Sequence, residues 1–173
     1  MPEATTLLDE ALAAWADARA GVIAEVENLE DRDLRRAPDG ARRTVVELVQ
    51  HIVEMGRLMS GELSRPDGDF RRKPPEAVFE EYALDRPASA DRGELVLLLR
   101  EAHQEGERRL REAGEIHMLQ RIRQFNGEYA TRLSWMVHGI GHEEYHRGQL
   151  ALYSRLLGHT PALTKMIYGD DAT

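Results

Sequence analysis

Apolar residues recur at three- and four-residue steps in four long segments of the chain, with polar residues between them. This period predicts amphipathic helices over about residues 6–29, 44–63, 90–113 and 132–157. Thr5 or Thr6 can cap the first helix, and Thr131 can cap the fourth. Thr44 with Glu47 three positions later is a capping-box pattern at the start of the second helix.

The segments between these helices predict different kinds of connection. Residues 64–90 are rich in proline and glycine, so they predict a long irregular connection, with a short helix possible in "PPEAVFEEYAL". The Asn126-Gly127 step lies between short alternating segments and predicts a small hairpin. The fold class expected is all-α: an up-down-up-down four-helix bundle forming a single domain over residues 1–173, with a long irregular connection between helices two and three.

The stretch "HGIGHEEYHRGQL" carries histidines four residues apart, at His138, His142 and His146. Residues at this spacing point to the same side of a helix, one turn apart. Trp135 and Tyr153 continue the stripe at either end, which predicts that they flank the histidines and wall a cavity. We expect this stripe to face the bundle interior and the solvent side to take Glu143, Glu144 and Arg147.

His51 stands at the edge of the apolar stripe of the second helix, one turn before Met55. If the two helices lie side by side, His51 meets the histidines of the last helix, and three imidazoles make a facial site for a divalent metal. Spacing leaves both the 138/142 and the 142/146 pairs open, so His138 is either a ligand or a pocket residue. Gln149 follows His146 by three positions and can orient its ring.

The remaining histidines and the glycines of the last helix carry weaker signals. His103, His117 and His159 show no such spacing and are interpreted as surface or loop residues. Gly139, Gly141 and Gly148 each weaken a helix, so they indicate either a close helix contact or room for a ligand.

Composition limits the classes of partner. The net charge is −8 and the densest basic cluster is only "RRK", so we expect no nucleic-acid or membrane partner and a small-molecule substrate instead. The chain has no cysteine, which excludes disulfides and thiolate ligands. The acidic start is unlike a signal peptide and no apolar run is long enough to span a bilayer, so a cytoplasmic location is expected.

The segment from His138 to Gly158 resembles the closing helix of the DinB/YfiT-like family, which ends in two histidines four apart followed by Arg-Gly-Gln. Here these are His142, His146 and residues 147–149, while "ELVQHIVEMGRLM" resembles the helix that supplies the third histidine, His51. The resemblance implies a four-helix bundle, one divalent ion on these three histidines, and a homodimer. Relatives in that family include transferases that use low-molecular-weight bacterial thiols.

Three hypotheses on function follow. The first is a metal-dependent thiol S-transferase acting on a small electrophile, with zinc as the first choice of metal and nickel or iron as alternatives. The second is a metal-dependent hydrolase, because "HEEYH" matches the His-Glu-x-x-His pattern in which Glu143 would be the general base. The third is a non-catalytic, stress-related metal-binding bundle.

Overall fold

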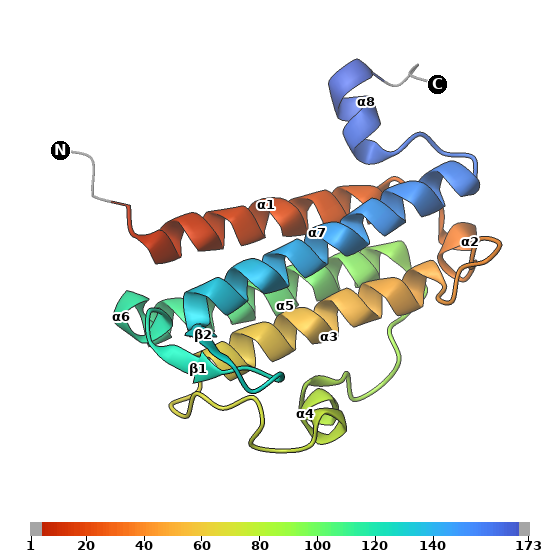
Figure 1. Cartoon of the computed structure of the whole chain (residues 1–173). Coiled ribbons are helices and arrows are strands. Elements are labelled where there is room, and N and C mark those ends of the chain that lie inside the picture. The colour runs from red at the N-terminus through yellow and green to blue at the C-terminus, as the bar shows by residue number, and fades with distance from the viewer. Residues whose placement is uncertain (1–4, 170–173) are drawn as a thin grey trace.

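The computed structural model describes residues 5–169, and four long helices dominate it (Figure 1). Three of them start at a threonine that caps the helix: Thr6 and Thr44 form capping boxes with Asp9 and Glu47, and Thr131 accepts a hydrogen bond from the Ser134 amide. The helices are α1 (Leu7–Glu27), α3 (Val45–Ser64), α5 (Arg92–Ala113) and α7 (Arg132–Leu156). The all-α four-helix bundle predicted from the sequence is therefore confirmed.

Short elements connect and cover the bundle. The hairpin predicted at Asn126-Gly127 is present: β1 and β2 pair antiparallel with Arg121 opposite Thr131, and Gly127 adopts a φ of 90° in the turn. The short helix predicted in the long connection is also present. These elements are α2 (Asp31–Leu34), α4 (Pro75–Tyr82), α6 (Glu115–Met118), α8 (Ala162–Tyr168), β1 (Arg121–Arg123) and β2 (Tyr129–Thr131).

The directions of the helices differ from the up-down-up-down order expected (Figure 1). Arg111 at the end of α5 pairs with Asp9 at the start of α1, so these two helices are antiparallel. Since α3 also runs against α1, helices α3 and α5 are parallel, and the order is up-down-down-up. The cause is the connection over residues 65–91, which returns along the bundle and is held to α3 where Glu54 and Gln50 accept the Leu84 and Ala88 amides.

As a result, α7 lies between α1 and α3, and it is packed closely against both. The bundle interior holds two apolar clusters, one toward each end. Between them is a layer that contains polar groups and a glycine, contributed by all four helices: Arg19, Gly56, His103 and Glu143. Within residues 5–169, every helix is too short or too polar to cross a bilayer.

Candidate metal centre

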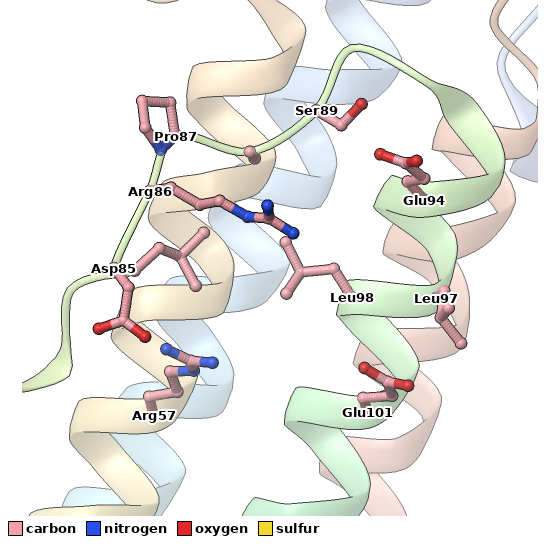
Figure 2. A pocket seen from close by; sticks show the side chains of 11 residues that line it. Arg57, Asp85, Arg86, Pro87, Ser89, Glu94, Leu97, Leu98 and Glu101 are labelled. Atoms are coloured by element: carbon pink, nitrogen blue, oxygen red, sulfur yellow. The ribbon is translucent and has the colours of Figure 1, made fainter.

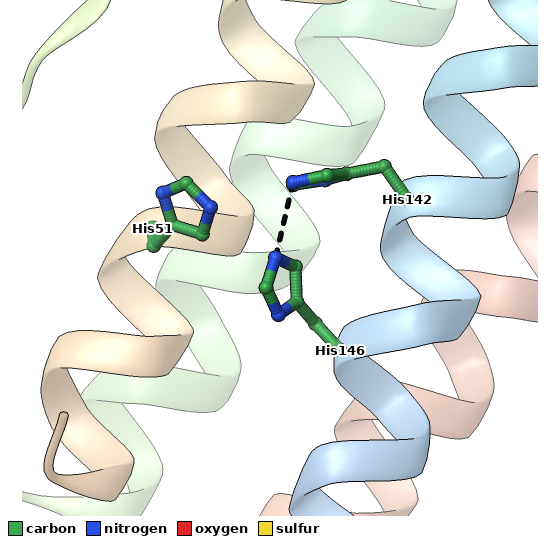
Figure 3. A group of neighbouring side chains, drawn as sticks. All are labelled: His51, His142 and His146. Atoms are coloured by element: carbon green, nitrogen blue, oxygen red, sulfur yellow. Dashed lines mark hydrogen bonds between the residues drawn. The ribbon is translucent and has the colours of Figure 1, made fainter. Parts of the chain in front are cut away.

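Three histidines meet where α3 and α7 run side by side in opposite directions (Figure 3). His51 comes from α3, while His142 and His146 come from successive turns of α7. One potential ligand nitrogen on each ring lies within 4.8 Å of those on the other two. We call this group the histidine triad. The structure thus brings together the 142/146 pair, which the resemblance favoured, and His51 across the helix interface.

The geometry and the donor atoms of the triad fit one divalent ion. The Nε2 atoms of His142 and His146 are 3.0 Å apart. Two nitrogens that share a tetrahedral ion at ~2.1 Å lie ~3.4 Å apart, so the His142–His146 pair is already close enough, and the widest separation in the triad must shorten by up to ~1.4 Å. Three imidazoles suit a transition metal, and a set of three protein ligands leaves coordination positions open for small molecules.

The triad is neutral at physiological pH, as metal ligation by imidazole requires. The pKa of His51 falls from 6.5 to about 4. Burial is the main cause, and repulsion from the positive charges of His146, Arg43 and His142 lowers the pKa further. The pKa of His142 is likewise lowered to about 4 by burial and by the nearby His146 and His138. Burial also lowers the pKa of His146, although its hydrogen bond to Gln149 opposes this shift.

Gln149 contacts the triad in the way its spacing suggested. The Nδ1 of His146 lies 2.6 Å from the amide oxygen of Gln149. Because that oxygen can only accept, Nδ1 carries the proton and Nε2 presents its lone pair toward His142. The Gln149 amide in turn donates to the Tyr145 hydroxyl at 3.3 Å. Tyr145 was not singled out from the sequence.

The other predicted pocket residues lie on opposite sides of the triad. His138 is exposed and stacks on Trp135 with ring centroids 4.7 Å apart, so it is outside the triad and belongs to a pocket wall. Tyr153 is buried on the far side, where its hydroxyl donates to the Arg43 carbonyl at 3.1 Å. It lines a cavity of about 290 Å³ that also includes Arg43 and Gln149.

A second cavity, of about 220 Å³, adjoins the triad on the side of the hairpin. His142 and Trp135 form part of its wall, as the helical stripe predicted for Trp135. Met55, Phe79 and Phe125 also line it but were not predicted as pocket residues, because nothing in a local pattern shows that α4 and the hairpin loop lie beside this part of α3 and α7. We call this cavity the aromatic pocket.

The prediction that Glu143 faces solvent is wrong. Glu143 is 3% exposed, and its carboxylate accepts from Arg19 Nε at 2.5 Å and from the Trp15 indole N–H at 2.8 Å. The face of α7 that packs on α1 passes through Glu143, so its charge is compensated inside the bundle. A glutamate followed by a second, exposed glutamate is normally interpreted as a surface residue, and its partners Trp15 and Arg19 are distant in the sequence.

The remaining histidines also have more specific environments than expected. His103 is buried and packs edge-on against Trp15, with ring centroids 4.4 Å apart, so its interpretation as a surface residue is wrong. His159 lies 2.8 Å from the buried carboxylate of Asp33, and His117 Nε2 lies 3.0 Å from the Leu63 carbonyl. None of these three belongs to the triad, because each lies against a different partner elsewhere in the bundle.

The three glycines of α7 separate into two kinds. A Cβ on Gly139 would lie 2.3 Å from the Met59 sulfur, so Gly139 permits the close contact of α7 with α3. A Cβ on Gly141 or Gly148 would meet nothing within 4 Å. A close contact within this chain therefore explains only Gly139.

A larger hollow, of about 840 Å³, lies between α3 and α5 under residues 84–89 (Figure 2). Its wall mixes opposite charges, including Arg57, Arg86 and Glu101, and contains none of the triad histidines. The triad therefore adjoins the aromatic pocket directly, through His142, and the cavity near Arg43 only through Gln149, which contacts His146.

Comparison with known proteins agrees with this description. A DinB-like protein from Bacillus subtilis has a crystal structure with a TM-score of 0.67 and 19% identity, over 87% of this chain and 93% of that one. YfiT from Bacillus subtilis, described as a probable metal-dependent hydrolase with an unusual four-helix bundle topology, has a TM-score of 0.65 and 20% identity, over 92% and 94% of the two chains. These similarities show the fold.

No curated protein matches the chain. The sequence profile of the DinB superfamily, however, matches residues 4–150, which include all of the triad and most of α7. The family match, the four-helix bundle and the triad at the α3–α7 interface agree with one another and together indicate a divalent-metal site. The chain therefore belongs to the DinB superfamily.

Proposed function

We propose that the protein is a metal-dependent transferase that activates a low-molecular-weight thiol toward a small electrophile, with His51, His142 and His146 as ligands of one zinc ion. Nickel and iron are the alternatives that imidazole ligands also accept. A divalent ion in the triad would lower the pKa of a thiol at an open position and so supply a nucleophile at neutral pH. The chain contains no cysteine, so the thiol comes from outside the protein.

The observation that carries this proposal is the position of Glu143. A hydrolase of the His-Glu-x-x-His kind needs that carboxylate as the general base for a water molecule. Here both of its oxygens accept hydrogen bonds from Arg19 and Trp15 in the interior. The group of potential ligands contains three histidines and no carboxylate, which favours a nucleophile that a metal ion alone can activate.

The residues of this chain would hold and orient the reactants. Gln149 fixes the tautomer of His146, and burial keeps the three imidazoles neutral. In the net transfer, the S–H bond of the thiol and one bond of the electrophile break. A carbon–sulfur bond forms, and the proton of the thiol ends on the leaving group.

The first experiment is elemental analysis of protein purified without an affinity tag. We expect close to one metal ion per chain, and loss of that metal in each of His51→Ala, His142→Ala and His146→Ala. His138→Ala is the matched control, because His138 is exposed on the same helix and outside the triad. Metal absent from the parent after reconstitution, or retained in all three variants, would contradict the proposed centre.

The second experiment separates the transferase from its alternatives. In cobalt-substituted protein, addition of 2-mercaptoethanol should change the visible spectrum, as expected when sulfur enters the coordination sphere. An unchanged spectrum in a metal-loaded protein would contradict the thiol transferase and leave the hydrolase and the non-catalytic, stress-related metal-binding bundle. The hydrolase remains the second candidate because YfiT is described in those terms. Ester hydrolysis without thiol, abolished in Glu143→Gln while the metal is retained, would favour it.

We also propose that the protein forms a homodimer through the outer face of α7. Exposed apolar side chains recur along this face at Val137, Tyr145, Leu152 and Leu156, with exposed fractions of 50–64%. Gly141 and Gly148 lie on the same face with open space above them, so they would let a second helix approach closely. Analytical ultracentrifugation should show a dimer that Leu152→Glu dissociates, whereas a monomeric parent would contradict the proposal.

A further inference from the structure

The aromatic pocket opens beside His142, and its walls come from four separate elements. Met55 belongs to α3, Phe79 to α4, Phe125 to the hairpin loop, and Trp135 and His142 to α7. Phe125 stacks on Phe70 with ring centroids 4.9 Å apart and lies 6.0 Å from the Trp135 ring. These ring contacts fix the wall before any ligand arrives.

The chemistry of the wall selects against negative charge. Among residues 5–169, no arginine or lysine lines the aromatic pocket, so an anion would enter it without a cationic partner. Glu143 reaches the pocket, but its oxygens already accept bonds from Arg19 and Trp15. The polar groups that remain for a ligand are the imidazoles of His138 and His142.

The size of the pocket limits its occupant to one ring. Its volume is about 220 Å³. An engineered apolar cavity of ~150 Å³ in another protein holds benzene, so this pocket holds one ring and a substituent of a few atoms.

We propose that the aromatic pocket binds the ring of a small, uncharged substrate and directs its reactive substituent toward His142 and the triad. The inference rests on the proposed function, because it assigns the electrophile of that transferase to the class of uncharged molecules with one aromatic ring. Trp135 and Phe125 are the specificity-determining residues: they contact the ring and not the reacting atoms. The cavity near Arg43, on the other side of the triad, is left for the thiol.

The test is a fluorescence titration with benzyl alcohol as the probe. The chain has two tryptophans. Trp135 lines the pocket, whereas Trp15 lies behind the lining residue Glu143, so a ring in the pocket should change mainly the emission of Trp135. We expect saturable binding of benzyl alcohol, at least about tenfold weaker binding of benzoate, and no response to glycerol. Equal binding of benzoate and benzyl alcohol, or no saturable binding, would overturn the proposal.

Two variants locate the site. Phe125→Ala should weaken benzyl alcohol binding by about fivefold to tenfold, since it removes one aromatic contact. Leu97→Ala is the matched control: Leu97 is an exposed residue of α5 that lines the larger hollow of Figure 2, and the affinity should not change. If Phe125→Ala binds as tightly as the parent while both keep the same circular dichroism, the pocket is assigned wrongly.

Each titration is repeated on metal-free and zinc-loaded protein, so that this inference and the proposed function can fail separately. Ring binding without metal binding would support the pocket and contradict the transferase. Metal binding without ring binding would keep the metal centre and overturn the assignment of the electrophile.

Discussion

Replacing Glu143 by alanine is expected to lower the free energy of unfolding by about 3–5 kcal/mol, the usual cost of breaking a buried ion pair by removing one partner. Arg19 is 2% exposed and its guanidinium donates twice to Glu143, at 2.5 and 3.0 Å. Only the Leu99 carbonyl, at 3.2 Å, would remain as an acceptor for Arg19. The Trp15 indole N–H would lose its acceptor as well.

Thermal and urea denaturation of metal-free protein measure this loss. For a chain of this size, 3–5 kcal/mol corresponds to a fall in Tm of about 6–20 °C. Glu144→Ala is the control from the adjacent position. Its carboxylate is 43% exposed and pairs with Arg147 at 3.2 Å, so its removal should cost less than about 1 kcal/mol.

A double variant tests the physical reason. In Arg19→Leu combined with Glu143→Leu, no charge is left buried, so more than half of the lost stability should return. A loss below about 1 kcal/mol in Glu143→Ala alone would refute the reasoning. It would show that the buried pair contributes little, and it would reopen the role of Glu143 as a general base.

Three further predictions concern stability. The unfolded state binds protons at histidine near pH 6.5, whereas the folded pKa of His51 is about 4. Metal-free protein should therefore lose stability as the pH falls from about 6.5 to about 4, with a smaller loss in His51→Ala, and equal slopes would contradict this sign. In Gly106→Ala, the new Cβ would lie 2.5 Å from the Trp15 ring and should destabilise the fold by about 1–3 kcal/mol. In Gly148→Ala the new Cβ meets nothing within 4 Å, so the free energy of unfolding of the monomer should rise by about 0.5–1 kcal/mol. Urea denaturation checks that the first variant is less stable than the parent and the second more stable.

Local signals in the sequence determined the four long helices and the N-caps of three of them, whereas the cap of α5, Asp91, was not predicted. Some features involve residues within a few positions of one another, so the sequence predicts them without knowledge of the fold. These are the capping boxes at Thr6 and Thr44 and the hairpin at Asn126-Gly127. The same is true of His142 and His146, because helical geometry alone brings residues four apart together. His51 could be added only as an expectation about which helices are neighbours.

Only the tertiary structure decided what depends on contacts between distant segments. The long connection over residues 65–91 permitted either direction for α5, and the sequence pattern is the same for both. The burial of Glu143 depends on Arg19 and Trp15, more than 120 positions away in the chain. The aromatic pocket likewise requires Phe79 and Phe125 to fold against α7. Periodicity reports which side of a helix is apolar, whereas the identity of the partner across an interface is a property of the packed bundle.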